Sequence, residues 1–367
     1  MHKKLLISAF LLGITCTIAY ISIKKWVLYP KEGSTLLTPI LTDENGSLNP
    51  FGKMARNAFG KFSEQRELFG DVINILLIGT DTSITRRTSG QLGFNTDTLI
   101  LVSANINTNR ILLTSVPRDL WINGNKINAL HTALGYEILQ DAFEKITGQK
   151  IDGFIKTDFD GFIWLVDAFG GVPVEVERTF SDYSFPNFED TDIMTVSFTQ
   201  GYELMPGERA LIFARSRKGT NGEGSDLMRA KRQHLLLEGI VDGVSQESSQ
   251  FSPMDISEFY DTVVQHMETS LNIDDVYYLW DFYKDRDKYE IESFVVGEDY
   301  LYHPGMYPDS PYHAWVFVPR EDSFEKLHLD IEAKLNGTFV SEEKLTESEG
   351  ISTEPQNGIG VGSEMLN

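Results

Sequence analysis

The chain opens with one long apolar stretch. Leu5 to Ile23 contains no charged residue, and two lysines flank it on each side. A helix of this length can cross the hydrocarbon core of a membrane. A cleaved signal peptide would have a shorter apolar core and a small-residue cleavage site, and a lipoprotein signal would have small residues before Cys16. The pattern therefore favours an uncleaved, single-pass anchor at 5–23, with residues 1–4 inside the cell and the rest outside.

From residue 71 onward, short apolar runs alternate with helical patterns. The runs predict strands over 72–78, 98–106, 110–116, 153–158, 172–176, 289–296 and 315–318. Periodic apolar positions predict helices over 128–146, 159–169, 206–214, 225–244, 322–335 and, as a pair, 253–283. Strands that alternate with helices indicate an α/β fold, in which a mixed central sheet is covered by helices.

The segments around this core have different compositions. Residues 24–70, rich at first in Pro, Gly, Ser and Thr, are typical of a stalk. We expect the catalytic domain at 71–250 and a helical and strand extension packed on it at 251–336. Residues 337–367 are rich in Ser, Glu and Gly with little to bury, which predicts a disordered acidic tail.

Composition narrows the class of protein. A chain of 367 residues with 41% hydrophobic residues can bury a substantial core. Its single cysteine, Cys16, excludes an intrachain disulfide and a cysteine-based metal site. A formal net charge of −22 argues against nucleic-acid binding, which requires a basic surface.

One segment reverses this acidic balance. Residues 206–235 contain three acids, against seven cations: Arg209, Arg215, Arg217, Lys218, Arg229, Lys231 and Arg232. Arginine binds phosphate oxygens through two parallel hydrogen bonds, so such a cluster favours an anionic ligand. The alternative is a solvated helix face balanced by nearby acids.

The spacing within this segment favours a ligand site. If 213–217 is extended, Arg215 and Arg217 point to the same side. On the predicted helix that follows, Asp226, Arg229 and Gln233 lie within about 60° of one another. Ser225 is the expected N-cap of that helix, and a helix N-terminus attracts anions.

Two acids and a further arginine follow predicted strand ends. Asp81 comes after the strand that stops at Gly79, Asp97 opens the next strand, and Arg118 follows the third. Two carboxylates at neighbouring strand ends can share Mg²⁺ or Mn²⁺, with phosphate and water completing the shell. The alternative for each acid is a loop cap or Asx-turn.

In this pattern the chain resembles the LytR–CpsA–Psr family over residues 71–245. The resemblance rests on ordered blocks: Asn74–Asp81, Thr96–Asn105, Ser115–Asp119, Lys126–Ala129, Asp158–Phe162, Val166–Val172, Leu204–Leu211, Ala214–Arg217 and Asp226–Gln233. It implies a membrane-anchored, extracytoplasmic enzyme that moves a glycopolymer from a polyprenyl-pyrophosphate carrier to a cell-wall acceptor such as peptidoglycan, commonly with Mg²⁺.

The resemblance also assigns roles to the matched residues. Asp81 and Asp97 correspond to the family's metal-binding or base acids. The expected catalytic set is Asp81, Asp97, Arg118, Arg215 and Arg217, and the expected substrate-binding set is Arg229, Gln233, Asp226 and Arg232. The isoprenoid tail would occupy an apolar pocket, for which Leu99, Leu101, Ile163 and Leu165 are either lining residues or ordinary core.

The chain departs from the family pattern at two positions. Ser83 and Asn95 stand where the family often has arginine, and the loop between them contains Arg86 and Arg87. Two other functions therefore stay open: a pyrophosphatase that hydrolyses the same lipids, and a non-catalytic lipid-binding regulatory module. Both acids and all four matched arginines are present, which argues against the regulatory module.

Overall fold

The computed structural model describes residues 69–83, 87–88, 94–187, 191–248, 253–283, 286–307 and 309–340. The predicted anchor at 5–23, nearly all of the stalk and most of the acidic tail lie outside these residues. Among the helices that the structure describes, none combines the length and apolar character needed to cross a membrane.

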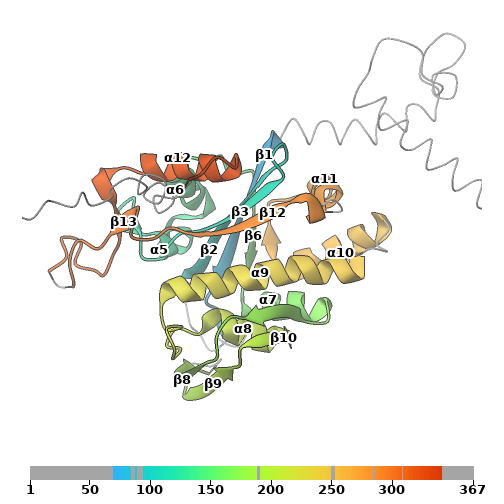
Figure 1. Cartoon of the computed structure of the whole chain (residues 1–367), viewed down its shortest axis with the longest axis horizontal. Helices are drawn as coiled ribbons and strands as arrows, with labels where there is room; N and C mark the ends of the chain where they lie inside the picture. Colours follow the sequence, from blue (N-terminus) through green and yellow to red (C-terminus); the bar gives the residue numbers. More distant parts are fainter. Residues whose placement is uncertain are drawn as a thin grey trace, which may run out of the picture.

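The centre of the molecule is a six-stranded mixed sheet, as the sequence predicted (Figure 1). Its strand order is β11-β6-β1-β2-β3-β12. β1 is antiparallel to β2 and parallel to β6, while β3 is antiparallel to β2 and parallel to β12. The strands are β1 (Val72–Thr80), β2 (Thr96–Asn105), β3 (Arg110–Ser115), β6 (Gly153–Thr157), β11 (Glu268–Thr269) and β12 (Glu290–Val295).

A bulge at one end of the β1–β2 pair sets up the polar end of the sheet. Gly79 pairs with Thr98 but Thr80 pairs with Thr96, so Asp97 is the extra residue. A Cβ at Gly79 would lie 2.9 Å from that of Thr98, so this approach requires glycine. The pairing brings Asp81, just past β1, and Asp97 to the same end of the sheet.

One face of the sheet is covered by α5 (Ile127–Leu134), α6 (Tyr136–Thr147) and α12 (Glu325–Leu335). The single helix expected at 128–146 was wrong, because Gly135 with φ of 93° and ψ of 175° interrupts it. Leu99 and Leu101 are 3% and 0% exposed and pack against these helices, which makes them ordinary core.

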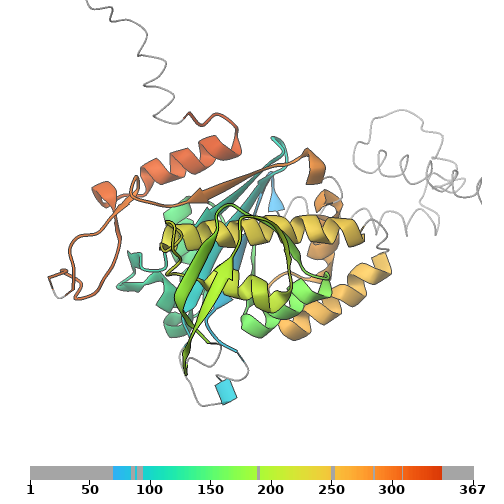
Figure 2. The ribbon, with the colours of Figure 1, turned by 60° about the horizontal axis from the view of Figure 1, so that its bottom comes forward.

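The opposite face carries α7 (Phe159–Ala168), α9 (Asp226–Ser248), α10 (Pro253–His266) and α11 (Ile273–Tyr283). Figure 2 shows the red α12 and the yellow α9 on opposite sides of the sheet. Buried Ile73 and Ile75 of β1 pack with Leu271 and Tyr278 on this side. Sheet residues therefore alternate between two cores, as a strand covered on both faces requires.

A second, smaller layer lies beyond α8 (Gly207–Arg215) and α9 (Figure 1). It consists of β7 (Val172–Val176), β8 (Phe180–Pro186), β9 (Ile193–Phe198) and β10 (Gly201–Met205). Four buried phenylalanines fill it: Phe180, Phe185, Phe198 and Phe213. The sequence predicted β7 but not the other three strands.

The C-terminal region completes the sheet. β11 and β12 are its two edge strands, so a boundary at residue 250 would divide one sheet. Short pairs link this region to the loop after β3, where Leu120 bridges to Phe317. The remaining elements are β4 (Trp121–Ile122), β5 (Asn125–Lys126), β13 (Leu301–Tyr302), β14 (Val318–Pro319), η1 (Arg286–Lys288) and η2 (Arg320–Asp322).

Candidate active site

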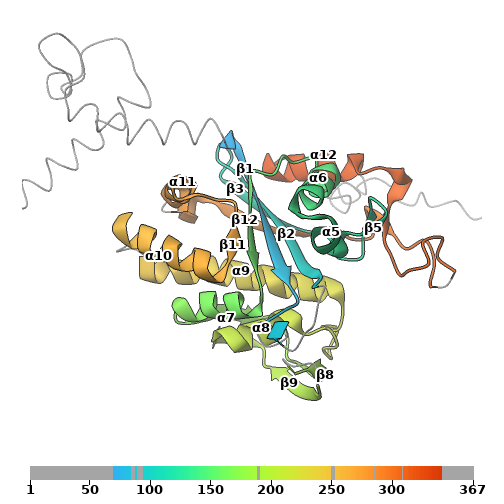
Figure 3. The same cartoon turned by 180° about the vertical axis from the view of Figure 1, so that it is seen from behind.

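Figure 3 shows the end of the sheet where β1 stops and β2 starts. Polar residues from distant parts of the chain meet at this end. Asp97 Oδ2 lies 2.7 Å from Arg118 Nη1. Asp119 Oδ2 lies 3.6 Å from Arg118 Nε. Burial lowers the pKa of Arg118, but the attraction of Asp97 and Asp119 is stronger together and leaves that pKa raised. The structure thus joins two predicted residues, Asp97 and Arg118, directly.

Arg215 approaches the other predicted acid. Its Nη2 is 3.8 Å from Asp81 Oδ1, and its guanidinium carbon lies 4.2 Å from the ring centre of Phe159 and 5.4 Å from that of Phe185. These faces hold the cation without neutralising it. The extended conformation considered for 213–217 does not occur, because α8, predicted over 206–214, continues through Arg215.

Arg217 and Arg229 share one carboxylate, Asp226. Arg217 Nε and Nη2 lie 3.1 and 3.3 Å from its two oxygens, and Arg229 Nη1 lies 3.4 Å from Oδ1. Burial raises the pKa of Asp226, but the two arginines outweigh it and leave that pKa lowered. Burial lowers the pKa of Arg229, and the charges of the nearby Arg217 and Arg118 lower it further. The attraction of Asp226 raises this pKa but does not outweigh these effects.

Two arginine donors in this group need an acceptor. Nε of Arg118 and Nε of Arg229 are buried and form no hydrogen bond within the described part of the chain. Buried N–H groups are rarely left without an acceptor, and guanidinium groups bind phosphate strongly. The arrangement fits a phosphate-bearing ligand seated against these side chains.

Gln233 joins the same site from α9. Its Nε2 donates to Thr98 Oγ1 at 2.9 Å and to the carbonyl of Ala214 at 3.5 Å. Ser225 caps the helix by accepting from Met228 N, as predicted. The next residue, His234, contacts Ser115 Oγ at 2.7 Å and Ser293 Oγ, so α9 is fixed to both β3 and β12.

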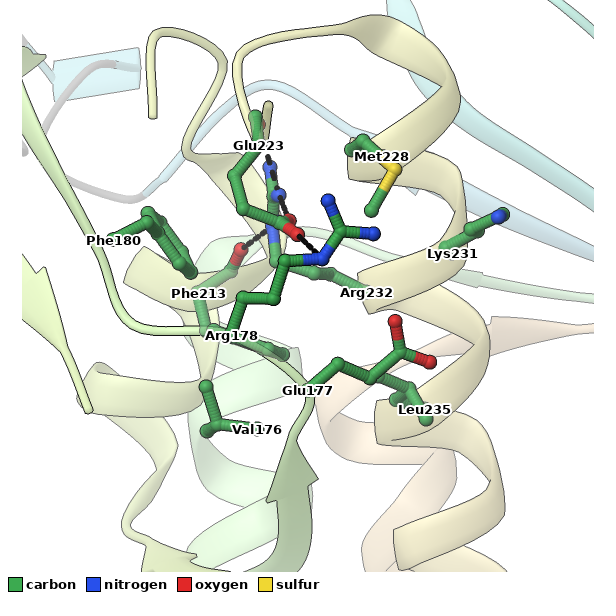
Figure 4. A pocket seen from close by; sticks show the side chains of 10 residues that line it. All are labelled: Val176, Glu177, Arg178, Phe180, Phe213, Glu223, Met228, Lys231, Arg232 and Leu235. Atoms are coloured by element: carbon green, nitrogen blue, oxygen red, sulfur yellow. Dashed lines mark hydrogen bonds and ion pairs between the residues drawn. The ribbon is translucent and has the colours of Figure 1, made fainter. Parts of the chain in front are cut away.

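Arg232 lies apart from this group, contrary to its predicted substrate-binding role. Its side chain is 2% exposed, and its Nη1 lies 2.7 Å from Glu223 Oε2 (Figure 4). Its remaining donors reach the carbonyls of Phe213 and Ser216. With its donors used inside the protein, Arg232 holds the end of α8 and the loop that follows.

Sequence reasoning missed a second support of this loop, Asp182. This residue is 2% exposed, and its Oδ2 accepts from Ser216 Oγ, Arg217 N and Lys218 N at 2.9, 3.2 and 3.1 Å. Its Oδ1 accepts from Ser184 N. Burial raises the pKa of Asp182, but these hydrogen bonds outweigh burial and leave it lowered. Asp182 comes from β8, a strand that the sequence pattern did not predict.

Two of these acids, Asp81 and Asp97, offer carboxylate oxygens, the ligand type that Mg²⁺ prefers. Within the described ranges no group of three or more His, Cys, Asp or Glu residues could hold a metal by itself. Mg²⁺ in phosphate-transferring proteins is commonly held by one or two carboxylates, with phosphates and water as the other ligands. Asp81 and Asp97 would supply the carboxylates, and a bound pyrophosphate would supply the phosphate oxygens.

The two departures noted in the sequence have structural counterparts. Ser83 is buried and Asn95 is exposed, with its carbonyl accepting from Asp81 N. Arg87 forms an ion pair of 2.7 Å with Asp158. Arg86 lies outside the described residues. Arg87 thus serves the start of α7 and not the arginine group around Asp97.

Comparison of the sequence with models of known protein families identifies the family of this chain. The model described as the LytR_cpsA_psr family matches residues 49–326. The chain belongs to the LytR–CpsA–Psr family. The match includes β11 and β12, so the family unit contains the whole central sheet.

Individual members of the LytR–CpsA–Psr family are distantly similar. A TagU polyisoprenyl-teichoic acid–peptidoglycan teichoic acid transferase of Oceanobacillus iheyensis is 29% identical over 216 residues, 56% of this chain and 60% of that protein. TagU of Halalkalibacterium halodurans is 29% identical over 251 residues, 65% of this chain and 76% of that protein. The crystal structure of B. subtilis TagV, 25% identical, superimposes with a TM-score of 0.54 and covers 72% of this chain and 98% of that one.

We expect Asp182→Asn to destabilise the protein by about 1–3 kcal/mol at neutral pH, because a buried set of donors loses its charged acceptor. The pKa of Asp182 is lower in the folded than in the unfolded chain. Its contribution is therefore complete above the unfolded value of about 4 and is lost as the pH falls through the folded value. Denaturant unfolding at pH 7 and at pH 3 measures this difference.

The matched control is Asp261→Asn, an exposed acid on α10. It should change the free energy of unfolding by less than about 0.5 kcal/mol at either pH. A gap between wild type and Asp182→Asn that stays constant down to pH 3 would contradict this role for the Asp182 carboxylate.

Proposed function

We propose that this protein is a membrane-anchored phosphotransferase that moves a glycopolymer from a polyprenyl-pyrophosphate carrier to a cell-wall acceptor such as peptidoglycan. The observation that carries the proposal is the gathering of Arg118, Arg215, Arg217 and Arg229 around three acids, Asp81, Asp97 and Asp226, with two buried guanidinium N–H groups lacking an acceptor. The teichoic acid transferases among its relatives support the same reaction class.

The arginines and the acids would serve different parts of this transfer reaction. An acceptor hydroxyl forms a new oxygen–phosphorus bond at the phosphorus next to the glycan, and the bond from that phosphorus to the bridging oxygen breaks. Polyprenyl phosphate leaves with the bridging oxygen. The arginines stabilise the charge that spreads over the phosphate oxygens. A Mg²⁺ or Mn²⁺ ion held by Asp81 and Asp97 would neutralise more of that charge when bound.

Asp81 is the stronger candidate for receiving the hydroxyl proton. Asp97 is committed to Arg118 by a contact of 2.7 Å, whereas Asp81 lies 3.8 Å from Arg215 and its side chain is 37% exposed. A general base must come within hydrogen-bond distance of the hydroxyl, and the more exposed carboxylate is the better placed to do so. We assign Asp97 mainly to positioning Arg118 and to the metal.

The lipid and the membrane form the remaining part of the proposal. The anchor at 5–23 would hold the domain outside the cell, close to a substrate that resides in the bilayer. The tail would lie on the sheet face toward α7 and α9. Ile163 and Leu165 of α7 are only half-buried there, whereas Leu99 and Leu101 belong to the other core.

The test of this function uses the full-length protein extracted from membranes and a labelled lipid-linked glycan, with and without peptidoglycan. Transfer predicts that label appears on peptidoglycan and that turnover depends on it. Release of free phosphorylated glycan at the same rate without peptidoglycan would indicate a pyrophosphatase. Retained lipid binding without any turnover would indicate a regulatory module.

Turnover should depend on the shape of the arginine side chain as well as on its charge. We expect Arg118→Lys and Arg217→Lys each to lower turnover at least about tenfold, because lysine keeps the charge but loses the fork that binds two phosphate oxygens. The matched control is Arg178→Lys, whose side chain is half-exposed beside Glu223, and which should keep wild-type turnover. Full activity in both site variants would show that these arginines do not bind phosphate in this way.

The metal gives a separate prediction. Asp97→Ala should lower turnover steeply, since it removes both a carboxylate ligand and the partner of Arg118. Its melting temperature without metal should change little, because partly exposed ion pairs contribute about 1 kcal/mol or less. Turnover of the wild type that persists in excess chelator would refute the role of a divalent cation.

A further inference from the structure

A cavity of about 450 Å³ opens at the same end of the sheet as the arginine group. Thr80 and Thr82 line it from the end of β1, Lys156 and Asp158 from the end of β6, His131 from α5 and His266 from α10. Its volume falls in the range of about 300–1,000 Å³ that is usual for small-molecule sites. None of the predicted site residues lines it.

Asp81 stands between this cavity and the arginines. Thr80 and Thr82, which line the cavity, are its neighbours in the chain. Thr80 is on the same face of β1 as Ile78, the face that packs under α5, whereas Arg215 reaches Asp81 from α8. The guanidinium group of Arg215 packs on the ring of Phe159, which follows the cavity-lining Asp158 in the chain. The two sites are therefore adjacent, and the proposed base lies between two cavity-lining residues in the chain.

The charges that line the cavity are paired. Arg87 Nη1 lies 2.7 Å from Asp158 Oδ2, and Lys156 Nζ lies 2.7 Å from Glu268 Oε2. With each cation matched by an acid, this lining does not select a phosphate, unlike the arginine group beside it. It suits an uncharged polar ligand.

The other lining groups favour a ring that carries hydroxyls. Thr80 and Thr132 donate to the carbonyls of Thr157 and Phe94, which leaves their oxygens able to accept. The ring of His266 is stacked on Trp164 at 4.2 Å between centres. The lining thus contains hydroxyl oxygens together with the rings of Phe94, His131 and His266, which suits the hydroxyls and the C–H groups of a pyranose.

His131 supplies a further polar contact. Its side chain forms no hydrogen bond inside the described part of the chain. Burial, and to a lesser extent Lys156, lowers its pKa, so the ring is neutral at neutral pH. A neutral imidazole has one nitrogen that accepts and one that donates, which matches a sugar hydroxyl.

We propose that this cavity binds an uncharged pyranose ring of the acceptor glycan and directs one of its hydroxyls toward Asp81. The inference rests on the proposed function for the identity of the acceptor. The donor pyrophosphate would then lie on the arginine side of Asp81 and the acceptor sugar on the threonine side. The same sugar chemistry could come from the donor glycan, and the experiment below separates the two sources.

The test compares wild type, His131→Ala and the control His313→Ala, an exposed histidine outside the cavity. Binding of a peptidoglycan tetrasaccharide is followed by saturation-transfer NMR without donor lipid. Transfer kinetics then give KM separately for tetrasaccharide and lipid-linked donor. We expect His131→Ala to weaken tetrasaccharide binding and raise its KM about three- to tenfold, because one hydrogen bond is lost. Its donor KM should change less, and the control should match wild type.

The outcomes are distinct. Equal tetrasaccharide binding by wild type and His131→Ala would overturn the proposal, as would a change confined to the donor KM, which would assign the cavity to the donor glycan. If the wild type shows no transfer, the proposed function fails. The binding measurement alone then decides whether the cavity takes a sugar at His131.

Discussion

The fold brings several arginines close together in this site, and their mutual repulsion is the constraint that the surrounding structure must offset. Arg118, Arg217 and Arg229 lie close enough for their charges to act on one another, and the pKa of Arg229 is lowered in part by the other two. Asp97 and Asp226 offset this repulsion by direct contact. These acids do not satisfy every hydrogen-bond donor of the arginines, since Nε of Arg118 and Nε of Arg229 are buried without an acceptor. A phosphate-bearing ligand would supply both the missing charge and the missing acceptors.

Such a group of like charges requires a rigid support. The loop between α8 and α9 is held from two sides: Asp182 binds the N–H groups of Arg217 and Lys218, and Arg232 binds the carbonyls of Phe213 and Ser216. One buried acid thus satisfies donors and one buried arginine satisfies acceptors of the same loop. Because both are nearly inaccessible to solvent, their contacts are stronger than surface ion pairs and fix where Arg215 and Arg217 begin.

The order of residues along the chain predicted strands and helix caps, but not strand register or the partners of buried side chains. Five of the six strands of the sheet could be read from apolar runs, and the cap at Ser225 from one hydroxyl residue before a helix. The short β11 lies inside 253–283, where the pattern predicted only helices. The pairing that brings Asp97 to Asp81 depends on a bulge at Gly79, and register is not visible in the order of residues. Arg232 and Arg229 look alike in the sequence, yet the first faces Glu223 inside the protein. That difference depends on Glu223 and on the carbonyls of Phe213 and Ser216, which meet Arg232 only in the folded chain.

The polar end of the sheet is therefore asymmetric. On the side of α8 and α9, Arg217 and Arg229 share the single carboxylate of Asp226, and donors remain for an anion. On the side of α5, the cations of the cavity are matched by Asp158 and Glu268. A group-transfer reaction between a pyrophosphate and a sugar hydroxyl needs both environments next to the reacting phosphorus, one for each reactant. Asp81, which follows β1 at the boundary, is the residue placed to serve both, since its chain neighbours line the cavity while Arg215 contacts its carboxylate.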